Sequence, residues 1–182
     1  MRRKDREMDR VRALEVVDAA AYTTLATVRA DGSPYCVPLS FVRNGNGIVL
    51  HGSCKGQKMD CFRRDDRVCL TFVGRVQVPP PMTPEEFSRM KAAGIGVRAL
   101  VSNTFTTEYE SAVAFGWIRE ITGPDEKRES LRSLCERYTP ESMEWFQLAA
   151  DASLAATCVL HVEMEQLTGK RKVIDNRETK SQ

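Results

Sequence analysis

The sequence predicts a mainly β domain with peripheral helices, an antiparallel α+β fold built as a closed or split barrel. Two observations carry this prediction. Turn signals at Asp31-Gly32 and in the Asn-Gly-Asn-Gly run at 44–47 separate short β-rich segments, as tight hairpins do. Further strands then alternate with short helices, giving about six strands and five helices in all. A chain of 182 residues with 42% hydrophobic residues suits one domain, 1–182, with a complete core.

The N-terminal segment is predicted to be a helix from about residue 5 to 21. Val11, Leu14, Val17 and Ala21 recur at helical spacing, while charged residues lie mostly off that stripe. This helix precedes the first strand.

Three strands are predicted next, over 22–28, 34–42 and 48–51. The tight turns between them join them as an antiparallel meander. Pro34 and Pro38 favour an edge position or an irregular path for the middle strand, because proline cannot donate to a ladder.

A long insertion between strands is predicted after a short helix over 56–64 and a strand over 67–73. It covers 74–107, because three consecutive prolines stop regular structure there. Within it, the segment Thr83-Pro84-Glu85-Glu86 begins a helix with a capping box, which should end near Gly94. Connections of this length are usually functional, so we expect it to lie over a cleft or along a partner subunit.

The second half continues with alternating elements. A strand is predicted over 111–121, an amphipathic helix over 124–138, another short helix over 140–150, and a last strand over 157–167. The polar, basic segment 168–182 is expected to be a fraying C-terminal tail.

Charge and composition argue against several partners. The net charge of +2 offers no basic surface for nucleic acid, and no apolar run is long enough for a membrane span or a secretory signal. We therefore expect a cytoplasmic protein. Six cysteines without a CxxC pair, and only two histidines, argue against a zinc ribbon, so no metal site is predicted. Cys54 stands out because it lies with Gly, Ser and Lys in a predicted loop.

The segment after the third strand could bind an anion. A strand ends at His51, a loop of small residues follows, and a helix begins near Gly56 with Lys58 in its first turn. Free N–H groups at a helix start favour a phosphate, to which Ser53 can donate its hydroxyl, while Lys55 or Lys58 supplies positive charge. Spacing alone equally describes a solvated Gly-Lys turn, and that simpler interpretation stays open.

The same region resembles a known family. From Gly32 to Lys58 the chain reads Gly-x-Pro-Tyr-x-Val-Pro-Leu, a hairpin, then His-x-x-x-x-Gly-x-Lys. This order resembles the pyridoxamine 5′-phosphate oxidase-like superfamily of FMN-binding split barrels, and within it the nitroimidazole-resistance branch. Shorter similar blocks at 2–7, 108–116 and 168–171 extend the resemblance over most of the chain.

The resemblance implies a homodimer with FMN at the subunit interface. It implies that residues 37–40 lie along the flavin ring, that 51–53 lie near the ribityl chain or ring edge, and that the start of the following helix meets the phosphate. Lys170 and Arg171 can close the site. The cofactor-binding residues that it implies are Val37, Pro38, Leu39, Ser40, His51, Gly52, Ser53, Gln57, Lys58 and Ser111.

The function we expect is that of an FMN-dependent oxidoreductase that reduces a small organic or nitroaromatic acceptor with NAD(P)H. No GxGxxG motif is present, so a nicotinamide would bind transiently, and no catalytic residue is predicted. The C-terminal Trp and Arg of pyridoxamine oxidases are absent, so pyridoxine metabolism is not expected. Two alternatives stay open: a non-catalytic FMN- or haem-binding module for sensing or storage, and a structural dimer with an empty cleft. For His51, cofactor contact ranks before a structural role and haem ligation.

Overall fold

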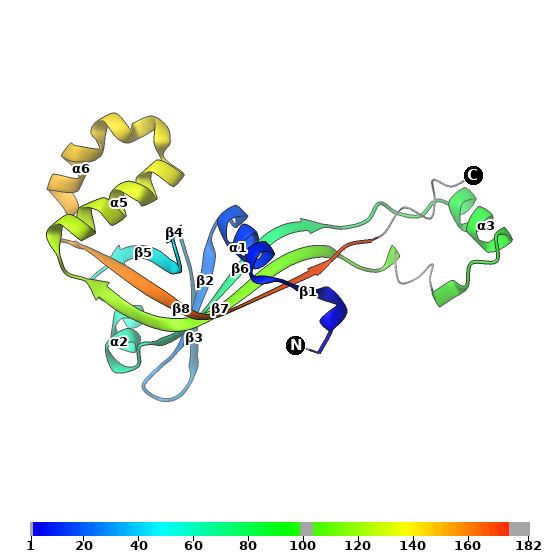
Figure 1. Ribbon diagram of the computed structural model, residues 1–182, viewed down its shortest axis with the longest axis horizontal. Coiled ribbons are helices and arrows are strands. Elements are labelled where there is room, and N and C mark those ends of the chain that lie inside the picture. Colours follow the sequence, from blue (N-terminus) through cyan, green and yellow to red (C-terminus); the bar gives the residue numbers. More distant parts are fainter. Residues whose placement is uncertain (1, 99–103, 175–182) are drawn as a thin grey trace.

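A computed structural model describes residues 2–98 and 104–174 of the chain. Within these residues eight antiparallel strands form one sheet, in the order β3-β2-β6-β7-β8-β5-β4, with β1 added to β8. Figure 1 shows helices at the ends of a rolled sheet and a long arm that carries one helix away from it. The predicted class, an antiparallel α+β split barrel, is confirmed.

The strands are β1 (Glu7–Met8), β2 (Thr23–Val28), β3 (Pro34–Leu39), β4 (Phe41–Asn44), β5 (Gly47–Ser53), β6 (Arg67–Gln77), β7 (Glu108–Ile121) and β8 (Thr157–Lys172). The helices are α1 (Arg10–Ala19), α2 (Gln57–Arg64), α3 (Pro84–Ala92), α5 (Pro124–Tyr138) and α6 (Phe146–Ser153), with 3-10 turns at Lys4–Arg6 and Pro140–Trp145.

The connection between β3 and β4 rolls the sheet into a barrel. These strands lie at the two ends of the hydrogen-bonded order, yet Ser40 alone joins them. Both edges of the sheet must therefore meet at this residue. The predicted single strand over 34–42 is wrong, because the chain leaves the β2–β3 hairpin at Ser40 and enters the β4–β5 hairpin. The hydroxyl of Tyr138 on α5 fixes the change by accepting the Phe41 N–H at 3.1 Å.

The barrel interior is filled by large apolar side chains from every long strand. Phe41 and Phe72 meet edge to face, with ring centroids 5.0 Å apart. Helix α1 packs against the same cluster through Val16 and Val17, and it crosses β8 closely at Gly169. The largest fully buried side chains of this cluster are Phe41, Phe72, Leu25, Ile48, Leu50, Met59, Leu70, Leu160, Met164 and Val17.

A second core lies outside the barrel, where α5 and α6 cover one end of β5 and β8. Val49 and Val159 face outward there and pack with Leu131, Leu134 and Phe146 from the helices. The barrel wall is therefore buried on both faces at this end, which explains why β5 begins with four consecutive buried residues.

Several predicted boundaries need correction. The eight strands exceed the predicted six, because the chain breaks at Ser40 and because residues 7–8 form β1 and not the start of a helix. Strand β8 continues to Lys172, so the predicted tail at 168–182 begins too early, since pairing with β7 and β1 extends the ladder. Residues 175–182 lie outside the described residues. The predicted helix at 140–150 is a 3-10 turn followed by α6.

The predicted insertion at 74–107 is an arm built on β6 and β7. Both strands continue past the barrel, to Gln77 and from Glu108, and α3 lies near the far end of the arm (Figure 1). The predicted capping box is confirmed, with the Thr83 hydroxyl accepting the Glu86 N–H. In this single chain the arm points away from α2 and the end of β5, so it does not cover the predicted cleft. Residues 99–103 of this segment lie outside the described residues.

None of the described helices combines the length and the apolar character needed to cross a membrane.

Candidate functional site

The strand change at Ser40 supplies the first part of the predicted site. Strand β3 lies at an edge of the sheet, as its two prolines suggested, with Val37 and Leu39 half-buried and Pro38 and Ser40 exposed. In the β4–β5 pair, Phe41 lies opposite Leu50. Ser40 directly precedes Phe41, and His51 directly follows Leu50. Residues 37–40 and residues 51–53 therefore lie at the same end of this antiparallel strand pair.

The end of β5 and the start of α2 supply the second part. His51, Gly52 and Ser53 are the last residues of β5 and pair with Val159, Cys158 and Thr157 of β8. The turn that follows is compact, because the Lys55 N–H donates to Ser53 Oγ at 3.2 Å.

Gly56 allows α2 to begin where it does. Its φ of 100° lies in a region that L side chains rarely adopt, and it is the N-cap of the helix. No side chain from the described residues caps this end, so backbone N–H groups of the first turn, including that of Gln57, are available. The predicted helix start, with Lys58 in the first turn, is confirmed.

The Lys58 ammonium lies directly over Gly52. A Cβ atom at Gly52 would sit 2.7 Å from Lys58 Nζ, so glycine allows the lysine to occupy this position without moving aside. Among the described residues, no carboxylate forms an ion pair with Lys58. A half-buried cation next to an uncapped helix start is an arrangement that binds an anion.

His51 adds a neutral ring beside this charge. Partial burial, followed by the positive charge of Lys58, lowers the pKa of His51 below its ordinary 6.5. At neutral pH the imidazole therefore offers one acceptor nitrogen and one N–H donor, which suits a hydrogen bond to a ligand.

The structure does not bring Ser111 to this group within one chain. Ser111 lies on β7 opposite Lys170 and Val73, whereas Ile121, ten positions further along the strand, lies opposite Val159, the partner of His51. Ten strand residues span roughly 33 Å. Ser111, Lys170 and Arg171 thus form a separate group near the base of the arm.

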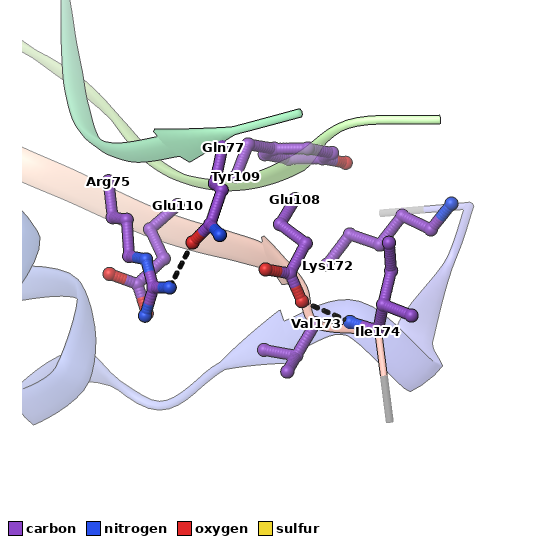
Figure 2. A pocket seen from close by; sticks show the side chains of 8 residues that line it. All are labelled: Arg75, Gln77, Glu108, Tyr109, Glu110, Lys172, Val173 and Ile174. Atoms are coloured by element: carbon purple, nitrogen blue, oxygen red, sulfur yellow. Dashed lines mark hydrogen bonds between the residues drawn. The ribbon is translucent and has the colours of Figure 1, made fainter. Parts of the chain in front are cut away.

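A pocket of about 300 Å³ lies at this base (Figure 2), lined in part by Glu110, the neighbour of Ser111, and not by the predicted cofactor residues of β3, β5 and α2. Two of its polar groups are already satisfied within the chain, since Arg75 donates to Gln77 and the Ile174 N–H donates to Glu108. Its volume is at the lower limit for a small-molecule site. The residues lining it are Arg75, Gln77, Glu108, Tyr109, Glu110, Lys172, Val173 and Ile174.

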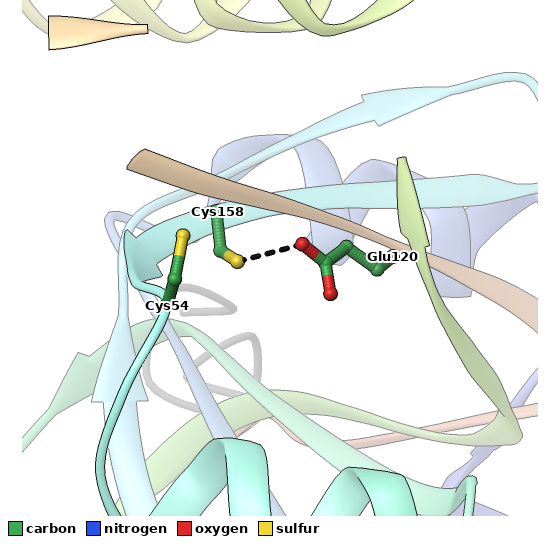
Figure 3. A group of neighbouring side chains, drawn as sticks. All are labelled: Cys54, Glu120 and Cys158. Atoms are coloured by element: carbon green, nitrogen blue, oxygen red, sulfur yellow. Dashed lines mark hydrogen bonds between the residues drawn. The ribbon is translucent and has the colours of Figure 1, made fainter. Parts of the chain in front are cut away.

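Sequence reasoning missed one cluster, formed by Cys54, Glu120 and Cys158 beside Gly52 (Figure 3). Glu120 and Cys158 lie 38 positions apart and meet only because β7 pairs with β8. No local motif could have revealed them.

The fold and this geometry define a class of protein. It is a split β-barrel in which a helix start able to bind an anion lies beside the link from β3 to β4. The family model named Pyridoxamine 5′-phosphate oxidase matches residues 11–171, and the chain belongs to this family. No curated protein matches the sequence.

Solved structures share the fold. A candidate 5-nitroimidazole antibiotic resistance protein from Bacteroides thetaiotaomicron is 21% identical, with a TM-score of 0.69, over 91% of this chain and 86% of that one. The flavocytochrome Anf3 from Azotobacter vinelandii is 19% identical, with a TM-score of 0.68, over 93% and 72%. An FAD- and haem-binding protein from Mycobacterium smegmatis is 21% identical, with a TM-score of 0.65, over 97% and 80%.

Proposed function

We propose that this protein is an FMN-binding flavoprotein that reduces a small organic or nitroaromatic acceptor, with NAD(P)H as transient donor. The observation that carries the proposal is the Lys58 ammonium over Gly52, beside the start of α2: no described residue forms an ion pair with this lysine or caps the helix with its side chain. A phosphomonoester there would gain both the backbone N–H donors and a charge-assisted hydrogen bond.

The residues of the site divide the work of holding the cofactor. Gln57 and Lys58 hold the phosphate, Ser53 and His51 donate hydrogen bonds near the ribityl chain or the ring edge, and residues 37–40 lie along the ring. The flavin, when bound, supplies the hydride and electron chemistry, so the protein needs no acid–base pair of its own. The site provides a single cradle for a phosphate, and FMN carries a single phosphate. This match favours FMN over a larger nucleotide.

A homodimer completes this proposal. Phe115 and Trp117 lie on the outer face of β7 and are each about half exposed, at 49% and 47%. Neighbouring Cys69, opposite Phe115, is half-buried and extends the apolar surface onto β6. Burial of this face against a second copy would remove it from water, and a second chain could bring its own Ser111 towards the FMN. The cytoplasmic location expected from the sequence stays a prediction.

The test begins with the absorption spectrum of the purified protein and the identity of the released chromophore, with the dimer checked by light scattering. Lys58→Ala should weaken FMN binding about 10–100-fold, the cost of losing a charge-assisted hydrogen bond. Lys55→Ala is the control, because this exposed lysine in the same turn should change affinity less than about fivefold. Equal affinities for the two variants would remove Lys58 from the site.

The second candidate is a haem-binding module, favoured by the neutral His51 ring at the end of β5. In that case the protein as purified would show a Soret band that His51→Ala abolishes. Steady oxidation of NAD(P)H with a nitroaromatic acceptor separates the enzyme from a sensor or storage protein, since a binding module would stop after one equivalent.

A further inference from the structure

Three side chains of types that can bind a metal converge at the mouth of the barrel, where β5 and β7 end and β8 begins. Cys54 follows the last residue of β5, Cys158 is the second residue of β8, and Glu120 lies one residue before the end of β7. One ligand atom from each lies within 4.8 Å of the others. Figure 3 shows the Cys158 thiol directed at the Glu120 carboxylate, with the Cys54 sulfur beside Cys158.

The strand register explains why they meet. Gly52 lies opposite Cys158, and Glu120 lies opposite Leu160, two residues further along β8. Residues two apart on a strand point to the same face, so Cys158 and Glu120 share the face of Leu160, whose side chain is buried in the barrel. Cys54 lies two residues after Gly52 and joins them from the neighbouring strand.

Cys158 and Glu120 already contact each other. Cys158 is buried and its thiol donates to a Glu120 carboxylate oxygen, with 2.9 Å between sulfur and oxygen. No ion pair of Glu120 is present among the described residues. A thiol proton thus occupies the place between two potential anions.

We propose that Cys54, Glu120 and Cys158 bind a zinc ion through two thiolate sulfurs and one carboxylate oxygen. Tetrahedral zinc with Zn–S bonds of about 2.3 Å separates its sulfur ligands by roughly 3.8 Å, which side-chain rotation within the observed cluster can reach. The fourth position is open to water or another small ligand. Two sulfurs and one carboxylate oxygen favour zinc over magnesium or calcium, which prefer oxygen ligands.

Proton balance and access are consistent with this site. Binding of one Zn²⁺ to two thiols and one carboxylate releases two protons, so affinity rises with pH. Glu120 is exposed and Cys54 is half-buried, which gives the ion a path from solvent, while the buried Cys158 anchors it. The ion would tie together the ends of three strands next to Gly52.

The test uses the full chain, reduced with a phosphine, loaded with Zn²⁺ and dialysed, with zinc measured by mass spectrometry. We expect one zinc per chain. Cys54→Ser and Glu120→Gln should each weaken zinc binding at least about 10-fold, the lower end of what loss even of a supporting group costs a metal site. Cys36→Ser is the control, because this exposed cysteine lies on β3, outside the cluster. Cobalt(II) should give a thiolate charge-transfer band that the first two variants lose and the control keeps.

Several outcomes would overturn the proposal. Reduced protein that retains no zinc, or Cys54→Ser protein that binds zinc as tightly as the parent, would do so. So would isolation of a Cys54–Cys158 disulfide that still fails to take up zinc after reduction. Cys54→Ser and Glu120→Gln alter residues outside the buried core, so the outcome does not depend on a Cys158 variant that fails to fold. These readouts are independent of flavin, so zinc binding and FMN binding can fail separately.

Discussion

The same two strands, β6 and β7, build both the barrel wall and the arm, but the two regions are held differently. Within the barrel, β6 alternates buried and partly exposed residues from Val68 to Phe72, and from Val73 onwards every residue is at least partly exposed. On β7, burial begins only at Ala112. The barrel half is therefore stabilised by packed, buried side chains, whereas the arm is held by backbone pairing and by exposed side-chain contacts such as that of Lys170 with the Tyr109 ring. This difference shows that a continuous ladder does not require a continuous core.

The largest effect should separate a barrel phenylalanine from an arm phenylalanine. Phe72→Ala removes a fully buried ring that packs on Phe41 and should cost about 3–5 kcal/mol in the free energy of unfolding. Phe87→Ala on α3 removes a side chain that is 44% exposed and should change that free energy by less than about 0.5 kcal/mol. Urea denaturation of both variants measures the contrast, and similar losses would show that the arm has a core of its own.

A smaller effect should appear in the pH dependence of the unfolding free energy. It should arise from the barrel and not from the arm, because both histidines lie on barrel strands. Burial, followed by a nearby cation, lowers the pKa of His51 and of His161 below 6.5, the cation being Lys58 and Arg119 respectively. Below about pH 6.5 the unfolded chain binds protons first, so stability falls with falling pH until the native histidines are also protonated.

Replacing both histidines by glutamine should flatten this dependence of the unfolding free energy between about pH 7 and 5.5. Asp65, whose pKa lies at about 2, titrates outside this window. An unchanged slope in the double variant would mean that other groups set the pH dependence.

The smallest effect is expected from removal of the arm tip. Gln77 pairs with Glu108, so a two-residue Asn-Gly turn between them can replace the whole intervening segment. Since α3 has no buried residue, the unfolding free energy should stay within about 0.5 kcal/mol of the parent value. Loss of FMN or of the dimer in this variant, with stability retained, would show that the arm acts on the partner subunit.

Local signals predicted the parts of the fold that local interactions determine. The Asn44–Gly47 turn, the Thr83 capping box and the amphipathic α5 could be identified because each depends on residues within one turn or helix. The break at Ser40 could not, since the alternation of apolar residues continues across it and the Tyr138 hydroxyl, which accepts the Phe41 N–H, lies 97 positions away from Phe41.

The candidate site divides in the same way. The Gly52–Lys58 segment is contiguous, so its glycine, its helix start and its lysine could be recognised together. The Cys54, Glu120 and Cys158 cluster depends on the pairing of three strands, whereas the sequence prediction of no metal site rested on the lack of a CxxC pair and on the presence of only two histidines. Ser111 was assigned to the cofactor site by resemblance. It lies far along β7 from the other predicted cofactor residues, so a role in cofactor binding would depend on a second chain.

The one-residue link at Ser40 has a consequence for the width of the barrel. A closed barrel keeps its circumference because hydrogen bonds run all the way around it, but here the ring is completed by covalent bonds at one point. A change in the backbone torsion angles of Ser40 would therefore alter the separation of the two edge strands without breaking any of the ladders. The link between β3 and β4 is therefore the position at which the width of the barrel can change.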